Sequence, residues 1–481
     1  MKLVNALRQE NVLTENGMAT NSSSLNPCVD LFFNIGAMRG QDKDRLLSQF
    51  SLAYTQDPQR AMKILFWARD VRGGAGERQI FRDIMGYLAE NYPDSLRKNI
   101  SLITEYGRWD DLLALEGTKL EADAFSLIQK GLLEHQNGLC AKWMPRKGIT
   151  AVKLRNFMGL TPKLYRKVLV ELTNVVEQLM CGKQWEDIDF SKIPSLASAR
   201  YQKAFWKNAK EQYEEYVSQL KKGEAKINAG AVYPYDITKS LHYGTADVAS
   251  EQWKALPNYM EGSTDMILPM VDVSGSMSTP AGGNPNVTCM DVAISLGLYI
   301  SERNEGPFKD AFLTFSGNPK LQVLSGSLKD RFTQLSCADW GMNTNIEAAF
   351  KVILDQAVKH GVSLDQMPDK ILILSDMQFD AATSLSGGWY RGTEVPTWNP
   401  TAQAMIERMY ADAGYNAPKI IYWNIQSRGG DIPVAFDKMG TALISGFSPA
   451  IMTSVLGADE FTPQAIMDKT IMSNRYESIK A

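Results

Sequence analysis

Apolar runs and amphipathic runs alternate through the second half of the chain, from about residue 263 onward. The apolar runs are short enough for buried strands, and polar or glycine-containing segments separate them. The clearest helix is predicted over Asn343–His360, where six apolar residues form one stripe at three- and four-residue spacings. Strands that alternate with such helices predict an α/β fold with a doubly wound, parallel sheet. The predicted strands are Met266–Val273, Ala311–Phe315, Leu321–Leu324, Lys370–Leu374, Lys419–Asn424 and Ala442–Gly446.

The first half of the chain has a different pattern, in which helical spacings repeat and alternating strand patterns are almost absent. Short breaks with glycine, proline or asparagine separate the predicted helices. Such a series favours helical hairpins stacked as a solenoid, or an irregular all-α domain; no exact repeat period is present. The predicted helices are Gln59–Val71, Glu77–Tyr92, Pro93–Tyr106, Leu120–His135, Pro162–Met180 and Ala197–Leu220.

The length of 481 residues suits two or three domains. We expect an α-helical domain over residues 1–235, a polar linker over 236–262 and an α/β domain over 263–481. No apolar run is long enough to span a membrane, and the first residues lack the apolar core of a signal peptide. The five cysteines are scattered and form no CxxC pair, which is typical of reduced thiols. These features predict a cytoplasmic protein that does not enter a membrane.

Oxygen-bearing side chains follow two of the predicted strands. Asp272, Ser274 and Ser276 alternate where the first strand ends, so their side chains can point to one side. Asp376 follows the strand Lys370–Leu374, and Thr344 lies at the start of the clearest helix. Ligands bind at the carboxyl ends of strands in open α/β sheets, and an all-oxygen set suits a hard cation. We therefore predict a site for one divalent cation, Mg²⁺, with a coordination position that a partner's carboxylate can take.

These five residues resemble the metal-ion-dependent adhesion site of von Willebrand factor A domains, which has the pattern DxSxS…T…D. The resemblance covers the second half of the chain and implies the same ligand roles for these residues. In many members Gly-Gly stands where this chain has Gly-Met-Asn before Thr344. Such domains generally bind partners and do not catalyse, so we expect no enzymatic activity. A serine nucleophile is not favoured, because the GxSxG motif is absent.

A basic segment in the first half offers a second kind of site. Between Lys142 and Lys167 there are eight basic residues and no Asp or Glu, although the chain has a net charge of −3. Basic side chains neutralise phosphates, and nearby aromatics such as Trp143, Phe157 and Tyr165 could stack on unpaired bases. From the residues alone we favour the other interpretation, a solvated helix face with the aromatics in the core, and an acidic protein partner would use the same charges. The candidate RNA-binding residues are Lys142, Arg146, Lys147, Lys153, Arg155, Lys163, Arg166, Lys167, Arg200 and Lys203.

The glycine-rich turn at 72–78 precedes a predicted helix. Backbone N–H groups in such a turn can bind an anion, but the segment lacks the Gly-Lys-Ser/Thr of a phosphate-binding loop. A helix end followed by a tight turn is the interpretation that we favour.

A helical-repeat domain followed by a von Willebrand A domain is similar to the architecture of the Ro autoantigen (TROVE) proteins, in which HEAT-like helical repeats form a ring that binds small noncoding RNAs. The chain looks closer still to an uncharacterised family of bacterial viruses, plants and some bacteria. The segments that carry this second resemblance are 68–85, 106–113, 141–148, 164–169, DVSGSM and ILSDMQFD. The resemblance to Ro implies an RNA-binding protein. The alternative is a metal-dependent protein-interaction module that binds no nucleic acid.

Overall fold

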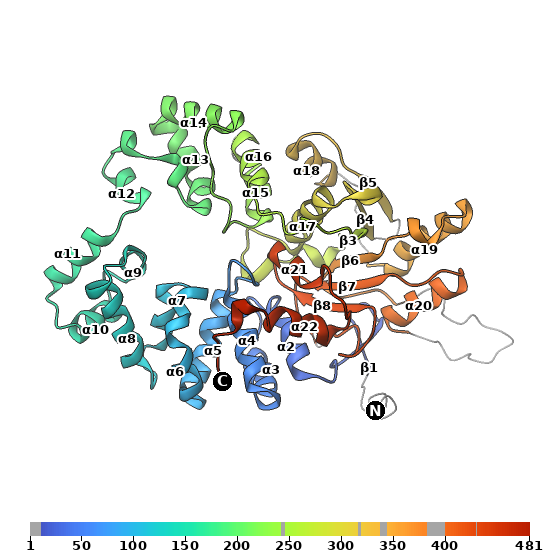
Figure 1. The fold of residues 1–481 in the computed structure, drawn as a ribbon, viewed down its shortest axis with the longest axis horizontal. Helices are drawn as coiled ribbons and strands as arrows, with labels where there is room; N and C mark the ends of the chain where they lie inside the picture. Colours follow the sequence, from blue (N-terminus) through green and yellow to red (C-terminus); the bar gives the residue numbers. More distant parts are fainter. Residues whose placement is uncertain (1–10, 242–245, 316–318, 337–343, 382–399, 430) are drawn as a thin grey trace. The chain divides into compact units, whose positions relative to one another are not determined.

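The computed structural model describes residues 11–241, 246–315, 319–336, 344–381, 400–429 and 431–481. Within these residues the chain forms two compact units, each discontinuous in sequence. The α/β unit comprises the described parts of residues 1–56, 233–242 and 258–473. The helical unit comprises the described parts of residues 57–232, 243–257 and 474–481. Figure 1 shows the six-stranded sheet of the α/β unit in yellow-green to red-orange and the helices of the helical unit in blue to yellow-green.

Six strands form the sheet of the α/β unit, in the order β5-β4-β3-β6-β7-β8. All neighbours are parallel except β5, which pairs antiparallel with β4 at one edge. All six predicted strands are confirmed, and each observed end lies within one residue of the predicted one. The strands are β3 (Ile267–Asp272), β4 (Ala311–Phe315), β5 (Lys320–Val323), β6 (Lys370–Ser375), β7 (Lys419–Asn424) and β8 (Thr441–Ser445).

Helices cover this sheet because each carries one apolar face. Helix α17 packs against β3 and β4, α19 packs against β4, and both α2 and α22 pack against β8. The predicted helix at 343–360 is confirmed as α19, which begins after Asn345 caps the N–H of Ala348 and ends at Gly361 in a left-handed conformation. The helices of this unit are α2 (Pro27–Ile35), α3 (Lys43–Gln56), α15 (Pro234–Ser240), α17 (Cys289–Arg303), α18 (Leu328–Ser336), α19 (Ile346–His360), α20 (Ala402–Asp412), α21 (Met452–Val455) and α22 (Pro463–Ile471).

A two-stranded hairpin near the start of the chain also belongs to the α/β unit. Its strands, β1 (Asn11–Leu13) and β2 (Ala19–Asn21), pair antiparallel. Single bridges join Gly17 to Asp380 and Asn21 to Ile432. The sequence analysis did not predict this hairpin, because three-residue strands are too short to show a period.

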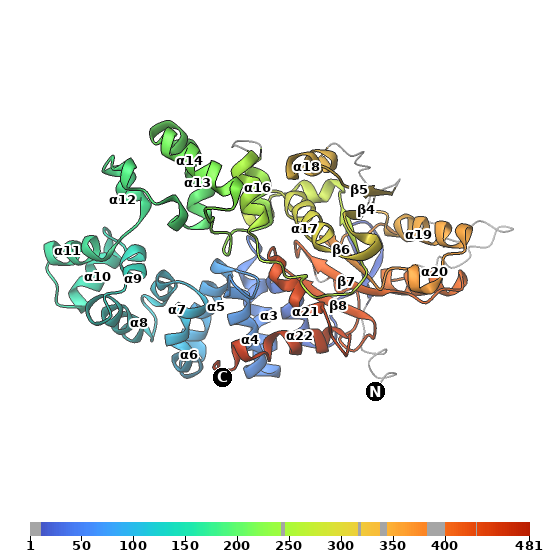
Figure 2. The ribbon, with the colours of Figure 1, turned by 45° about the horizontal axis from the view of Figure 1, so that its top comes forward.

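The helical unit contains short helices joined by tight connections, as Figure 2 shows in a second view. Two of them begin with a side-chain cap followed by proline, with Asp57 before α4 and Thr161 before α11. No helix of the described residues is long and apolar enough to span a membrane. The helices are α4 (Pro58–Arg69), α5 (Arg78–Asn91), α6 (Pro93–Asn99), α7 (Ile103–Tyr106), α8 (Glu121–Gln129), α9 (Gly138–Trp143), α10 (Ile149–Phe157), α11 (Pro162–Leu172), α12 (Val176–Cys181), α13 (Ser195–Asn208), α14 (Lys210–Lys222) and α16 (Ala246–Lys254).

Three predicted helices are each divided in the structure. The run 93–106 divides into α6, a 3₁₀ turn over Ile100–Leu102 and α7. The run 162–180 divides between α11 and α12, and the run 197–220 divides at Ala209 between α13 and α14. At Ala209, the rings of Phe205 and Tyr213 pack across the break with centroids 5.4 Å apart and planes tilted by 51°. Burial of both rings against each other favours a helical hairpin over one continuous helix.

The structure distributes three segments differently from the domain boundaries that we expected. Residues 11–56 lie in the α/β unit, where α2 packs on β8, and not with the other N-terminal helices. Residues 474–481 lie in the helical unit. The expected linker contains α15 and α16, and Trp253 of α16 is only 2% exposed. Local periodicity predicts that a helix forms but not which unit covers its apolar face.

Candidate cation site at the carboxyl edge of the sheet

The first part of the site lies where β3 ends. Asp272 is the last residue of β3 and is fully buried. Its Oδ1 accepts a hydrogen bond from the N–H of Ser274 at 2.9 Å. A short 3₁₀ turn, η6 (Gly275–Ser278), follows and brings the Ser276 hydroxyl within 2.9 Å of the Ser274 hydroxyl. One carboxylate and two hydroxyls of the predicted set are therefore adjacent.

The second part comes from β6, the parallel neighbour of β3. Ser375, the last residue of β6, donates from its hydroxyl to Oδ2 of Asp272 at 2.6 Å. Asp376 follows and is 1% exposed. Met377 then takes a left-handed backbone conformation with φ of 64°, which is uncommon for a residue with a side chain and is often found at functional sites.

The position of these residues follows from the order of the strands. From β3 the chain adds β4 and β5 on one side of the sheet, and it then adds β6, β7 and β8 on the other side. The direction in which strands are added therefore reverses between β3 and β6. Open α/β sheets bind ligands at the carboxyl ends of the strands at such a reversal. Asp272 and Asp376 lie at this point.

The electrostatics of the pair are unfavourable without a positive partner. Burial, and then the negative charge of Asp376, raise the pKa of the Asp272 carboxyl to about 7. Burial also raises the pKa of Asp376, although Arg428 and the Ser276 hydroxyl act against this. The Oδ2 atom of Asp376 is buried and accepts no hydrogen bond, and Nη2 of Arg428 forms an ion pair with it at 3.5 Å. The pair therefore fits a cation, which would offset both charges.

Thr344, the fifth predicted ligand, immediately precedes the cap of α19 and is 1% exposed. Its hydroxyl accepts a hydrogen bond from Nδ2 of Asn16 at 3.4 Å, and the same amide donates to the carbonyl of Gln378 at 2.7 Å. Asn16 thus links Thr344 to the loop that carries Asp376. Residues 341–343, which form the unusual Gly-Met-Asn, lie outside the described residues.

Three further residues at the site were missed by the sequence analysis. Ser375 was adjacent to a predicted ligand and could have been found from the end of its strand. Arg428 follows β7 and donates from Nη2 to the carbonyl of Ser276 at 2.8 Å, so a strand-end rule would also have indicated it. Asn16 carried no signal, because it is more than 300 residues away in sequence. Among the described residues no group of three or more His, Cys, Asp and Glu side chains could hold a metal, and this site has only two carboxylates.

The ten candidate RNA-binding residues all lie in the helical unit, on α9 to α11, in their connections and on α13. Two of those near α10 and α11 are neutralised: Lys153 pairs with Glu116 at 2.8 Å, and Lys167 pairs with Glu171 at 3.5 Å. Such exposed pairs contribute little to stability, but they reduce the local positive charge. Eight of the ten are exposed, and Lys142 and Arg155 are half-buried.

The aromatic residues of the basic segment are less available than its cations. Tyr165 is 3% exposed and belongs to the core. The guanidinium of Arg108 lies 3.7 Å from the ring centre of Trp143. Phe157 is 41% exposed and meets Phe125 edge to face. Base stacking on Tyr165, which the sequence suggested, does not fit its position in this structure.

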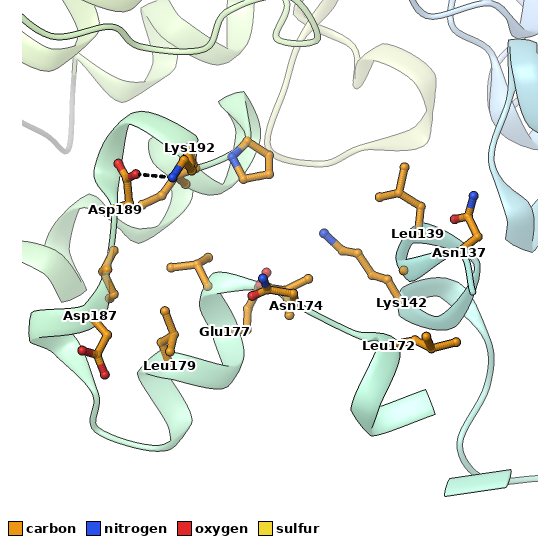
Figure 3. Close-up of a pocket in the computed structure, with 16 residues that line it drawn as sticks. Asn137, Leu139, Lys142, Leu172, Asn174, Glu177, Leu179, Asp187, Asp189 and Lys192 are labelled. Atoms are coloured by element: carbon orange, nitrogen blue, oxygen red, sulfur yellow. Dashed lines mark ion pairs between the residues drawn. The ribbon is translucent and has the colours of Figure 1, made fainter. Parts of the chain in front are cut away.

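Lys142 lines a pocket of about 700 Å³ within the helical unit. Figure 3 shows its side chain reaching from α9 toward Glu177 of α12, with the ion pair of Asp189 and Lys192 on the far wall. Leucine, valine and isoleucine side chains supply most of the remaining lining. Lys142 therefore lies in a pocket, whereas Lys147 is exposed on the surface.

Three backbone N–H groups of the glycine-rich turn at 72–78 already donate hydrogen bonds within the chain. The N–H groups of Gly74, Ala75 and Glu77 donate to carbonyls at the end of α4. A Cβ on Gly74 would lie 1.9 Å from the carbonyl oxygen of Trp67, so this position requires glycine. The turn closes α4, as we favoured, and these three groups are not free to bind an anion.

The fold and site define a two-unit protein. Its α/β unit has a mostly parallel sheet, and buried side-chain oxygen atoms lie close together where the strand order of this sheet reverses. Residues 266–480 match a domain of unknown function, DUF7788, and residues 14–125 and 152–266 match another domain of unknown function, DUF2828. The uncharacterized protein L728 of Acanthamoeba polyphaga mimivirus is 29% identical over 516 residues, which cover 94% of this chain and 86% of that protein. The chain is thus similar over nearly its whole length to a protein without an assigned function, in agreement with the resemblance to an uncharacterised family.

Proposed function

We propose that this protein is a non-catalytic binding protein that holds one divalent cation, Mg²⁺, and uses it to capture an acidic side chain of a protein partner. The observation that supports the proposal most directly is the pair of buried carboxylates at adjacent strand ends. The negative charge of Asp376 raises the pKa of Asp272, and one carboxylate oxygen of Asp376 accepts no hydrogen bond. A buried arrangement of this kind is costly unless a cation offsets it.

The donor set matches the chemistry of Mg²⁺. Asp272, Ser274, Ser276 and Asp376 would hold the ion, with Thr344 as the fifth oxygen. Mg²⁺ binds oxygen ligands and keeps waters where protein ligands are few. The bound ion would supply the positive charge that attracts a partner's carboxylate. The predicted resemblance to von Willebrand A domains and the doubly wound strand order support the same proposal.

The proposal is tested by asking whether protein partners associate with this protein only when both the cation and Asp272 are present. Full-length protein is purified from its own cells in Mg²⁺, and co-purifying proteins are identified with and without EDTA. We expect a set of partners that is lost in EDTA and in Asp272→Ala. Ser278→Ala, which changes an exposed residue of η6, is the matched control. If a folded Asp272→Ala variant retains every partner, the proposal is wrong.

RNA binding by the helical unit is the second candidate. The observation in its favour is that Lys147, Lys163 and Arg166 are exposed and form no ion pair with the described residues. Positive side chains in such positions bind phosphates with a strong dependence on salt. Their reversal to Glu is expected to remove RNA that co-purifies when no nuclease is used, measured as the A260/A280 ratio and by sequencing. Lys309→Glu, Lys329→Glu and Lys359→Glu, all at exposed positions of the α/β unit, control for the same change in net charge. Nucleic acid that is absent from the wild-type protein, or unchanged by the reversals, contradicts this candidate.

A further inference from the structure

The pocket beside α9 is bounded by two packed parts of the helical unit. On one side α9 lies directly against the end of α11, where a Cβ on Gly138 would come within 2.8 Å of the carbonyl oxygen of Leu172. On the other side Ile188 and Ile193 are buried in a hydrophobic core, and Leu179 of α12 packs against that core. Because both walls belong to packed structure, the pocket exists before a ligand arrives.

The size and lining of this pocket suit a small molecule. Ligand sites commonly have volumes of ~300–1,000 Å³ and a mainly apolar lining with a few polar groups. This pocket has a volume of about 700 Å³, and the side chains of Leu139, Leu172 and Leu179 line it. Leu139 is 64% exposed, so a ligand with an apolar body would remove apolar surface from water.

Two unpaired charges of opposite sign face each other across the pocket. Lys142 reaches from α9 toward Glu177 of α12, as Figure 3 shows. The ammonium group of Lys142 forms no ion pair or hydrogen bond with the described residues and lies 5.4 Å from the ring centre of Trp143. Glu177 accepts a hydrogen bond from the Tyr201 hydroxyl at 3.1 Å but has no cationic partner in the described part of the chain. Because Lys142 and Glu177 do not pair directly, a ligand between them can pair with both.

These charges favour a zwitterion over a simple ion. A purely anionic ligand would be repelled by Glu177, and a purely cationic ligand would be repelled by Lys142. The other charges of the lining matter less. Asp189 and Lys192 pair with each other at 2.9 Å, and Asp187 is exposed to solvent, which screens its charge. The two half-buried charges that remain are therefore one positive and one negative.

Two amide side chains indicate which kind of zwitterion fits. Asn137 and Asn174 line the pocket, and neither side-chain nitrogen donates a hydrogen bond to a described residue. Oδ1 of Asn137 accepts from the N–H of Cys140 as the cap of α9, so its amide nitrogen is the atom available to a ligand. Such nitrogens donate to carbonyl groups, which a peptide backbone supplies. A drug-sized volume also accommodates a peptide of about two or three residues.

We propose that this pocket binds a short apolar peptide, with the C-terminal carboxylate of the peptide at Lys142 and its N-terminal ammonium at Glu177. Asn137 and Asn174 would donate to the backbone carbonyls of the peptide, and its apolar side chains would cover the leucines of the lining. The pocket shares no residue with the cation site. The inference therefore goes beyond the proposed function and is tested independently of it.

Isothermal titration calorimetry of the full-length protein tests the inference, with the free peptides Leu-Phe and Leu-Leu-Phe as probes. Two blocked peptides are compared with Leu-Phe: N-acetyl-Leu-Phe lacks the positive charge, and Leu-Phe-amide lacks the negative charge. The variants are Lys142→Met, which keeps most of the aliphatic stem, and Glu177→Gln. Lys147→Met and Glu186→Gln are the matched controls, because both residues are exposed and neither lines the pocket.

We expect the wild-type protein to bind Leu-Phe roughly tenfold or more tightly than either blocked peptide, because each block removes one hydrogen bond between charged groups. Lys142→Met should weaken the binding of Leu-Phe and N-acetyl-Leu-Phe by a similar factor and leave Leu-Phe-amide unchanged. Glu177→Gln should weaken the binding of Leu-Phe and Leu-Phe-amide and leave N-acetyl-Leu-Phe unchanged. The two controls should bind all three peptides as the wild type does.

The inference is wrong if the wild-type protein binds neither free peptide at about 10 mM, or binds both blocked peptides as tightly as Leu-Phe. These two results come from the wild-type protein, so they do not depend on how a variant folds. Equal weakening of all three dipeptides by Lys142→Met, in a variant that melts at the wild-type temperature, would also contradict the assigned contact. None of these results alters the case for the cation site.

Discussion

Replacement of Asp272 by Asn should stabilise the protein without a cation and remove its response to Mg²⁺. The carboxyl of Asp272 has a pKa raised to about 7 by burial and by Asp376, against 3.8 for an ordinary aspartate. A shift of about three pH units corresponds to about 4 kcal/mol of unfavourable ionisation in the folded state above pH 7. Because the folded pKa is raised, this penalty is absent below about pH 4 and grows as the pH rises toward 7.

The hydrogen bonds of Asp272 reduce the expected gain. The carboxylate accepts from the N–H of Ser274 and from the hydroxyl of Ser375. An Asn keeps one acceptor, and the Ser375 hydroxyl can rotate to accept from the new amide, at a cost of about 1–2 kcal/mol for the altered bonds. The net gain of Asp272→Asn in EDTA at pH 8 is therefore about 2 kcal/mol. It should shrink at pH 5, where roughly a third of the penalty remains.

Magnesium should reverse this order. A ligand at a hundred times its dissociation constant stabilises the folded state by about 2.7 kcal/mol, and the variant should lose that stabilisation. Hydrogen exchange of peptides from β3 and β6, measured by mass spectrometry, reports the opening free energy of the α/β unit. Asp365→Asn, at an exposed position, is the control. If Asp272→Asn is less stable than wild type in EDTA at pH 8, or if Mg²⁺ stabilises both proteins equally, the reasoning is refuted.

Three further predictions concern other parts of the molecule. Arg428→Gln removes a positive charge next to the predicted cation and should raise the affinity for Mg²⁺ severalfold in isothermal titration calorimetry; an unchanged or weaker affinity would argue that the cation binds elsewhere. Gly74→Ala, whose Cβ would lie 1.9 Å from a carbonyl oxygen of α4, should lower the free energy of unfolding in urea by about 3 kcal/mol or more, whereas Gly86→Ala, with nothing within 4 Å in α5, should raise it by about 0.5–1 kcal/mol. Equal effects of the two changes would contradict the close contact. Cys181 is exposed and should react with a thiol reagent in the native protein, whereas Cys140 is buried, with its pKa raised to about 12, and should react only after unfolding; rapid labelling of Cys140 in the native state would contradict its burial.

The sheet and most of the candidate site could be predicted because their signals are local. Asp272 and Asp376 each end or follow an apolar strand, and parallel strands bring their carboxyl ends to one edge. The capped start of α19 likewise placed Thr344 near a helix end. These features depend on a few neighbouring residues, so the pattern was sufficient.

The parts that could not be predicted depend on contacts between residues that are distant in sequence. Asn16 reaches Thr344 only because the hairpin is anchored to Gln378, more than 360 residues away. The position of α2 on β8 and the division at Ala209 depend on which apolar faces meet. The sequence also could not show which aromatic side chains are exposed. Tyr165, for example, is buried in the core of the helical unit.

The most direct test of the central claim is a crystal structure of the full-length protein grown in saturating Mn²⁺, with the ion located from its anomalous scattering. We expect one strong peak within about 2.2 Å of oxygens from Asp272, Ser274 or Ser276, and close to Asp376, at the carboxyl ends of β3 and β6. No peak at this position, or a single peak elsewhere in the molecule, would contradict the assignment of a cation site and the function proposed from it.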